Sequence, residues 1–403
     1  MSAALRDSLD VNQKPAFDES ITKRQYHSYQ PYSNVALGNN DEIRIAINQQ
    51  DLYTFPAESY LYMQGTINKP ATVTEEVLFV NNGAMFLFDE IRYELNSIEI
   101  DKIRNPGTTT TIKGYISIPH GSVHRYQNAG WDSDGNKTGT FELCIPLSHI
   151  FGFAEDHRKL IINARQDLIL HRAASDVNAL KTAKDGCTVT LNKLLWRVPH
   201  VHVSDAVRLK LLKTLDSRRS LSIGFRSWEC FEYPHLPRTT KVSWAVKTSS
   251  HTEKPRYVVI AFQTKRKNNI TADMSKFDHC SITSLKVFLN SDTYPYDPLS
   301  IDFSTDKYSV LYDMYAAFQE SYYSGDRSEN SPLLSKALFK SEAPIFLFDV
   351  KLAQEAVKTT TSDLRLEIES SINIPESTSA FCLVLHDKMF EYNPLSGQVN
   401  KLL

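Results

Sequence analysis

The sequence predicts an all-β protein made of two consecutive β-sandwiches. Short runs that alternate apolar and polar residues, separated by turn residues, recur through most of the chain, as in sandwiches and barrels. Aromatic residues reach 11%, with 19 Tyr and 20 Phe, and they favour strands, as do the many Val, Ile and Thr residues. The length of 403 residues allows two or three domains, each with its own hydrophobic core.

The composition narrows the function class. Hydrophobic residues make up 41% and charged residues 23%, which is typical of a folded globular protein and too apolar for a disordered one. The net charge is −2 and the pI about 6.6, whereas a protein that coats nucleic acid by charge alone would carry an excess of Lys and Arg. A structural subunit that encloses nucleic acid without gripping it is compatible with these values.

The first residues contain no targeting signal. Residues 1–25 are polar and aperiodic and are predicted to form a flexible N-terminal arm, and residues 1–20 have no apolar core, which excludes a signal peptide. No stretch approaches the roughly 18 apolar residues of a membrane span, so we expect a soluble protein made in the cytosol. The cysteines are widely spaced without a C-x-x-C pair and are expected to be free thiols: Cys144, Cys187, Cys230, Cys280 and Cys382.

A hairpin is predicted over residues 91–101, with its turn at Asn96-Ser97. Before the turn, the apolar residues at alternate positions should face the core. After the turn, apolar residues should alternate with two solvent-facing acidic residues. The expected core positions are Ile91, Tyr93, Leu95, Ile98 and Ile100, and the expected outward positions are Arg92, Glu94, Glu99 and Asp101.

Further strands follow in both halves. Residues 188–203 continue the β character and are expected to break at Pro199, which cannot donate to a strand ladder. In the second half, residues 256–264 form a near-continuous apolar run, as in a strand covered on both faces. The remaining predicted strands lie around Val242–Val246, 284–290, Leu364–Ile368 and 380–386.

Only two segments have helical periodicity. In 204–217, Ser204 is a candidate cap, and Val207, Leu211 and Leu215 repeat every four residues. In 306–322, Asp306 is the candidate cap of a helix whose apolar stripe should be core: Tyr308, Leu311, Tyr312, Tyr315, Phe318 and Tyr322.

The first of these helices lies near the middle of the chain. About 180 residues of β-rich sequence lie on either side, which is the size of one eight-stranded jelly roll with long loops. No residue-level repeat relates the halves. We therefore expect an arm (1–25), a first jelly roll (26–205), a linker helix (206–217) and a second jelly roll (218–403).

Motifs of known chemistry are absent. The sequence contains no G-x-x-x-x-G-K-[ST], G-x-S-x-G or H-E-x-x-H, so no motif supports a nucleotide-binding, hydrolase or zincin site. His200 and His202 would share one face of a strand as a metal pair, but no third ligand lies nearby in sequence. We predict no catalytic, cofactor-binding or metal-binding residues, and no enzyme activity.

Three weaker signals have ordinary explanations. Asp132-Ser-Asp134-Gly-Asn136 resembles the start of a calcium loop but lacks the terminal Glu, so an exposed turn is favoured. Asn136 and Asn269 begin glycosylation sequons that have no secretory route to make them relevant. The basic run 265–267 is expected to be a solvated loop, with contact to packaged DNA as the alternative.

Residues 86–103 (FLFDEIRYELNSIEIDKI) read as a strand, a tight turn at Asn96-Ser97 and a second strand with "I-D-K". This segment resembles the major capsid proteins of eukaryotic DNA viruses, in which the turn is Gly-Gly. Residues 143–151 (LCIPLSHIF) resemble the family's "P-L" strand end and aromatic helical segment, and 160–170 supply the next strand. The family's Asn-Pro-Gly is absent here and is replaced by Glu155-Asp156-His157.

The second half is similar to coat-protein-like reading frames of Polinton-type and adintovirus-like elements. The segments that carry this similarity are 225–237 (FRSWECFEYPHLP), 252–263 (TEKPRYVVIAFQ), 289–296 (LNSDTYPY) and 390–395 (FEYNPL). Each motif is moderately specific, and their order along a chain of this length strengthens the combination.

The resemblance implies a double jelly roll: two consecutive eight-stranded jelly-roll β-sandwiches with a few short helices. It also implies a major capsid protein that trimerises into pseudo-hexagonal capsomers and builds an icosahedral virion shell. The partners implied are the protein itself, penton or minor capsid proteins, and non-specific contact with packaged DNA or an internal membrane. The expected location is the virion, after synthesis in the host cytoplasm and assembly in the host cytoplasm or nucleus.

Two alternatives belong to other classes. One is a receptor- or glycan-binding β-sandwich, such as a spike or minor capsid protein of the same virion. The other is a cupin-like enzyme, which would need a cluster of His ligands inside a barrel, whereas the twelve His residues are scattered.

Overall fold

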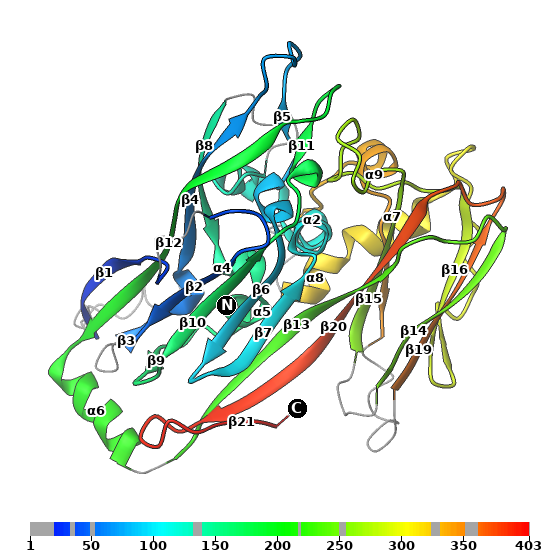
Figure 1. Ribbon diagram of the computed structural model, residues 1–403. Coiled ribbons are helices and arrows are strands. Elements are labelled where there is room, and N and C mark those ends of the chain that lie inside the picture. The colour runs from blue at the N-terminus through cyan, green and yellow to red at the C-terminus, as the bar shows by residue number, and fades with distance from the viewer. Residues whose placement is uncertain are drawn as a thin grey trace, which may run out of the picture.

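The computed structural model describes residues 20–32, 37–48, 53–131, 139–216, 219–249, 255–323, 331–350 and 362–402. In this part of the chain, each half forms two antiparallel sheets around its own hydrophobic core (Figure 1). The all-β fold class predicted from the alternating runs is confirmed.

The long strands of the first half form two sheets ordered β1-β12-β4-β8 and β2-β10-β6-β7. Two of the two-residue strands, β3 (Tyr53–Thr54) and β9 (Ile161–Ile162), extend the first sheet. The other two, β5 (Leu78–Phe79) and β11 (Leu180–Lys181), pair with each other. The long strands are β1 (Ile21–Tyr29), β2 (Glu42–Ile47), β4 (Tyr60–Asn68), β6 (Phe88–Leu95), β7 (Ile98–Arg104), β8 (Thr140–Pro146), β10 (Gln166–Arg172) and β12 (Thr188–Val203).

The second half forms sheets ordered β13-β20-β15-β18 and β14-β19-β16-β17. A short strand, β21 (Val399–Lys401), also pairs with β20. The other strands are β13 (Leu221–Tyr233), β14 (Lys241–Ser249), β15 (Pro255–Thr264), β16 (Ile282–Leu289), β17 (Asp292–Tyr294), β18 (Phe346–Asp349), β19 (Ser362–Ser370) and β20 (Thr378–Tyr392).

Both halves have the same topology. When the long strands of each half are numbered from first to eighth along the chain, the two sheets have the orders 1-8-3-6 and 2-7-4-5 in each half. This is the arrangement of an eight-stranded jelly roll, and it recurs although the two halves show no residue-level repeat. The architectural duplication expected from the sequence is therefore present in the sheets.

Helices fill the connections between strands. In the first half they are α2 (Pro106–Ser117), α3 (Val123–Gln127), α4 (Leu147–Ile150) and α5 (Gly152–Asp156). Next comes α6 (Asp205–Asp216), followed in the second half by α7 (Ser309–Ala316), α8 (Phe318–Tyr323) and α9 (Lys336–Glu342). Short 3-10 turns lie at Pro56–Glu58 (η1), Gly83–Leu87 (η2), His120–Ser122 (η3) and Val177–Ala179 (η4). None of the helices among the described residues is long and apolar enough to span a membrane.

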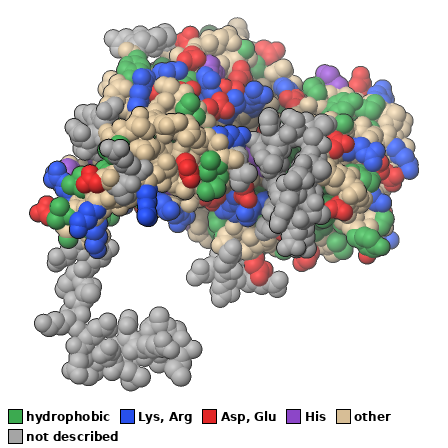
Figure 2. Space-filling model, turned by 90° about the horizontal axis from the view of Figure 1, so that it is seen from below, with side chains coloured by type: hydrophobic (Ala, Val, Ile, Leu, Met, Phe, Trp, Pro, Cys, Tyr) green, Lys and Arg blue, Asp and Glu red, His purple; other side chains and the backbone are tan. Residues whose placement is uncertain are grey.

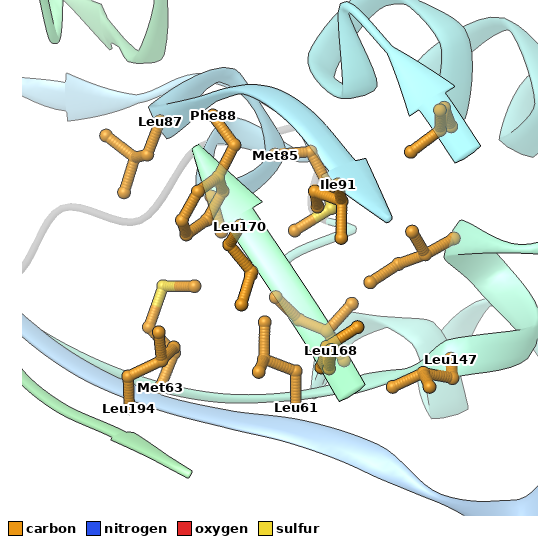
Figure 3. Close-up of a cluster of buried hydrophobic side chains, with 14 of the residues drawn as sticks. Leu61, Met63, Met85, Leu87, Phe88, Ile91, Leu147, Leu168, Leu170 and Leu194 are labelled. Atoms are coloured by element: carbon orange, nitrogen blue, oxygen red, sulfur yellow. The ribbon is translucent and has the colours of Figure 1, made fainter. Parts of the chain in front are cut away.

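Each core lies between the two sheets of its half. In the first half, Leu61 and Met63 of β4 face Leu168 and Leu170 of β10 in the interior (Figure 3). This core also contains residues of the second half: Ile223, Phe225, Phe390 and Tyr392. The ends of β13 and β20 therefore extend beneath the first sandwich, as Figure 1 shows, and tie the two halves together.

The hairpin is confirmed, with one correction. Asn96 and Ser97 both have positive φ (49° and 67°), as expected for a two-residue turn of this kind, and the positions before the turn are buried as predicted. After the turn, Ile98 is 42% exposed and Asp101 is buried, which reverses the predicted roles. The reason is tertiary: β7 packs beside β13 of the second half, and Asp101 faces that strand instead of solvent.

The predicted break at Pro199 is wrong, since β12 continues through it to Val203. Pro199 lies where the partner of β12 changes from β4 to β3, so its missing N–H falls at a gap in the ladder. Its carbonyl accepts a hydrogen bond from the Phe55 backbone N–H at 3.0 Å.

The helix predicted over 306–322 is two helices, α7 and α8, separated at Ala317. Asp306 does not cap it: the N-cap position is Tyr308, without a side-chain cap, and Asp306 has φ 57° and binds Lys340 at 2.6 Å. The aromatic stripe is nevertheless confirmed as core, except that Tyr312 is only partly buried.

The remaining expectations concern the ends of elements. The helix predicted over 204–217 is present as α6 and carries no buried residue. The predicted arm was too long, because residues 21–25 belong to β1. Of the remaining arm, only Ser20 lies within the described residues. All five cysteines are free, as predicted, and three of them are buried: Cys187, Cys280 and Cys382.

Candidate functional site

The two sandwiches meet at a junction of charged and aromatic side chains. On the first sandwich it is formed by β7, α2 and α5, and on the second by β13 and α8. Its side chains are Asp101, Lys113, Glu155, Asp156, Arg226, Ser227, Tyr322 and Tyr323, and we call this set the junction.

Arg226 of β13 makes a two-pronged ion pair with Asp156 of α5. Its Nε and Nη2 donate to the two carboxylate oxygens at 2.8 and 2.6 Å, and its backbone N–H donates to the same carboxylate at 2.8 Å. The guanidinium also lies 3.7 Å from the centre of the Tyr322 ring. Burial alone would lower the pKa of Arg226, but the bonds to Asp156 outweigh it and raise that pKa above its usual value.

Glu155 is buried next to this pair and is the acceptor for three groups. Lys113 Nζ lies 2.8 Å from its Oε2, and the hydroxyls of Tyr322 and Tyr323 donate to its two oxygens at 3.1 and 3.0 Å. Lys113, itself 1% exposed, also donates to the Ser148 carbonyl at 2.8 Å. Burial, and then the Glu155 charge, raise the pKa of Tyr322 and Tyr323 well above normal, so both remain hydrogen-bond donors.

Asp101 connects the strands of the two halves. One of its oxygens accepts from the Ser227 hydroxyl at 2.7 Å, and the other accepts from the Phe153 backbone N–H at 3.1 Å. Nearby, Gly152 allows α5 to approach β13: a Cβ there would lie 1.7 Å from the Arg226 carbonyl oxygen. Only a residue without a side chain fits at that position.

The helices of the two halves also contact each other. The Tyr315 hydroxyl of α7 donates to the Tyr115 carbonyl of α2 at 2.9 Å, and the Gln319 amide of α8 donates to the Ile118 carbonyl at 3.0 Å. Both contacts are buried. They satisfy one carbonyl in the last turn of α2 and the carbonyl of Ile118, the residue that follows the helix, and neither has a partner within the helix.

His149 lies buried beside the junction. Its ring packs against Trp131 and Tyr126, with centroids 6.0 and 5.6 Å away. Burial, reinforced by the Lys113 charge, lowers the pKa of His149 to about 3, so the side chain is neutral at physiological pH.

The contacts of the junction can hold the two sandwiches in one orientation. Each charge faces an opposite charge or a hydrogen-bond donor. Lys113 and Glu155 are buried, Arg226 and Asp156 are partly buried, and Tyr323 is exposed. Within the described residues, no group of three or more His, Cys, Asp or Glu side chains could hold a metal ion.

His200 and His202, the pair considered for a metal, differ in burial. His200 is buried and its Nε2 lies 2.8 Å from the Tyr29 hydroxyl, whereas His202 is exposed. The nearest ring to His200 is His27 of β1, 4.1 Å away between centroids. Burial, and then His27 and His202, lower the pKa of His200 to about 4, which fits a neutral core histidine.

The basic run 265–267 is largely neutralised within the chain. Arg266 makes a two-pronged pair with Asp278 at 2.9 and 2.6 Å, and Lys267 binds Glu232 at 2.7 Å. Asn269 is half-buried, and its side-chain oxygen accepts from Thr271. Asp132, Asp134 and Asn136 lie outside the described residues.

The junction residues were not singled out from the sequence. The available signal was the departure at Glu155-Asp156-His157, where the capsid-protein pattern has Asn-Pro-Gly. Two adjacent acidic residues after an aromatic helical segment are unusual in a core, and they prove to be the acceptors for Lys113 and Arg226.

The sequence matches the family described as the double jelly roll-like domain over residues 77–390. The chain belongs to this family. The double jelly roll accounts for the repeated sheet order. No curated protein matches the sequence.

Solved double jelly roll structures have the same fold at low sequence identity. A chain from the Sputnik virophage is 8% identical, with a TM-score of 0.66 over 98% of this chain and 92% of that one. The Faustovirus major capsid protein is 9% identical, with a TM-score of 0.62 over 94% and 92%. The mavirus major capsid protein is 9% identical, with a TM-score of 0.56 over 100% and 95%.

Proposed function

We propose that this protein is a major capsid protein, the repeating structural subunit of a virion shell. The observation that carries the proposal is the double jelly roll itself, whose two halves have one topology and are joined by the ion pairs of the junction. The similar structures named above include the major capsid proteins of Faustovirus and mavirus, across nearly their whole length.

The rest of the proposal concerns assembly. We propose that three copies form a capsomer with six jelly rolls, and that capsomers tile an icosahedral shell together with penton or minor capsid proteins. Six similar units from three chains need each chain to supply two sandwiches in a fixed relation, which is what the junction provides. The chain is divided accordingly at α6, into a first roll up to residue 205 and a second from residue 218.

The surface suits a subunit that packs against many copies. Lys and Arg side chains are interspersed with Asp and Glu over the described part of the face in Figure 2, and the net charge is −2. A mixed, nearly neutral surface allows close packing without strong repulsion between copies. Contact with packaged DNA or an internal membrane is then a weak and non-specific one, since Arg266 and Lys267 already bind acidic residues of the chain.

Mass measurement by light scattering, combined with negative-stain imaging, tests the proposal. We expect trimers of the purified full chain, and spherical particles at high concentration. A protein that stays monomeric at every concentration, and instead binds glycans, would overturn the capsid assignment in favour of a receptor-binding sandwich. We expect no enzyme activity and a location in the virion.

A further inference from the structure

The first strand of each jelly roll occupies the same place in its sheet but has different surroundings. β1 and β13 are each the outer strand of a 1-8-3-6 sheet, bonded on one side to the eighth strand of the same roll. β13 buries Ile223, Phe225, Ser227 and Trp228. In β1, by contrast, every residue from 21 to 28 is exposed.

The cover over β13 comes from three elements of the first roll. They are its fifth strand (β7), the helix between its fifth and sixth strands (α2), and α5, which follows the sixth strand. Lys113 of α2, for example, lies 5.6 Å from the Trp228 ring, and Asp156 of α5 binds Arg226.

The second roll has an apolar hollow at the same side, between its fifth and sixth strands. The end of the fifth strand (β17), the helices between the fifth and sixth strands (α7 and α8), the sixth strand (β18) and Tyr257 of the third strand (β15) line a space of about 350 Å³. Its apolar residues include Pro295, Met314, Ala317, Phe318, Leu347 and Phe348. No first strand of the described chain covers this hollow, since β13 covers the other roll and β1 is exposed.

We propose that β1 of one copy docks against this hollow on the second roll of a neighbouring copy, repeating between chains the contact that β13 makes within the chain. The inference rests on the proposed capsid function, because it defines the contact that would hold the trimer together. The occupant is a second copy of this chain, since β1 is the only other first strand that the jelly-roll repeat provides.

The chemistry of β1 fits a protein interface. Its Tyr26 is 42% exposed and packs 5.5 Å from the Tyr60 ring, and the Arg197 guanidinium lies 6.0 and 5.5 Å from these two rings. Tyr and Arg are the residues most enriched at interface hot spots. The exposed basic side chains Lys23 and Arg24 of β1 also match the acidic Asp349 that lines the hollow.

A contact between unlike surfaces has a directional consequence. Each copy offers one strand and one hollow, so the interface is heterologous and closes only as a ring or continues as a filament. In a ring of three copies, first and second jelly rolls would alternate around a circle of six. The two rolls of one chain would meet at the junction, and rolls of neighbouring chains would meet at the new contact.

Two variants test the two sides of the contact. Ala317→Glu places a charge in the hollow, and Tyr26→Glu places one on the strand. We expect each to shift the full-length chain from three copies to one in light scattering, at concentrations where the unmodified chain is trimeric. Val310→Glu, on α7 but outside the hollow, and Ile372→Glu, on a loop, change residues that are 64% and 57% exposed and should leave the trimer intact.

Mixing the two variants gives the decisive result. The Tyr26→Glu chain keeps its hollow and the Ala317→Glu chain keeps its strand, so one intact contact per pair should give a complex of two unlike copies and no larger ring. This rescue also shows that both variants are folded. If both variants remain trimeric, or if the mixture stays monomeric while each variant melts like the unmodified chain, the docking proposal is wrong. An unmodified chain that never associates would instead count against the capsid function itself.

Discussion

Two arginines on the first strands of the two rolls show how burial changes the value of an ion pair. Arg226 of β13 binds Asp156 with both side chains less than one-fifth exposed, and its neighbour Glu155 is buried with Lys113. Arg24 of β1 binds Glu58 with side chains 38% and 45% exposed. A buried charge that loses its partner cannot recover water, whereas an exposed one can. The junction should therefore dominate the stability of the folded chain, and the β1 surface should contribute little until a partner covers it.

The largest expected effect comes from Glu155→Ala, which leaves the buried Lys113 charge without its partner. We expect the free energy of unfolding to fall by about 3–5 kcal/mol. Chemical denaturation of the full chain measures it. Glu155→Gln separates the roles in part, because its single amide oxygen still accepts from one tyrosine hydroxyl but the side chain no longer neutralises Lys113. A loss below about 1 kcal/mol for the alanine variant would mean that Lys113 reaches water, contrary to its burial.

The second prediction concerns the contact between the helices. Tyr315→Ala removes a buried ring of α7 together with its hydrogen bond to the Tyr115 carbonyl. We expect a loss of about 3 kcal/mol or more, as for other large-to-small changes in a core. Tyr312→Ala is the matched control, since the same helix carries this ring partly exposed, and its loss should be clearly smaller. Equal effects of the two substitutions would show that burial does not set their contribution.

The sequence was sufficient for the sheets but not for the junction. The hairpin at 91–101, the buried strand at 256–264 and the aromatic stripe of α7 and α8 were predictable because local periodicity reflects a core face. Asp101 was misplaced because its burial depends on β13, a strand far away in sequence. Nothing local marks a carboxylate whose partner comes from the other half of the chain.

The same limitation explains the errors at the ends of elements. Pro199 was expected to end a strand, but a proline is tolerated where the neighbouring strand changes, and that change is a property of the sheet. Residues 21–25 look like a polar arm because both faces of β1 are exposed, so no alternation of apolar residues marks them as a strand. Because β1 is exposed, its sequence lacks the apolar alternation that would have predicted a strand. The same exposure makes β1 a candidate for docking.

The third prediction concerns acid. Folded His149 has a pKa of about 3, below the ordinary value near 6.5 of an unfolded chain. Between these values the unfolded state binds a proton that the folded state does not, so stability falls as pH decreases through this window. From pH 6.5 to 5 the expected loss is about 1.6 kcal/mol, because the slope reaches its full 1.36 kcal/mol for each pH unit only below the unfolded pKa.

Chemical denaturation of the unmodified chain and of His149→Leu at several pH values measures the contribution of His149 to the pH dependence of stability. The variant should lose stability less steeply on acidification. Part of the slope should remain, because burial also lowers the pKa of His157 and His200, each to about 4. Identical slopes in the two proteins would place His149 in contact with solvent.

The smallest expected effect is at β1. Glu58→Ala removes the exposed partner of Arg24, and we expect a change below about 1 kcal/mol in the stability of the monomer. This is the counterpart of Glu155→Ala and completes the comparison between the two first strands. A loss as large as that of Glu155→Ala would show that β1 is held as firmly as β13, and its exposure would then not imply a missing partner. A small loss in the monomer, together with weaker trimer formation, would instead place the value of this ion pair in orienting Arg24 for the contact between copies.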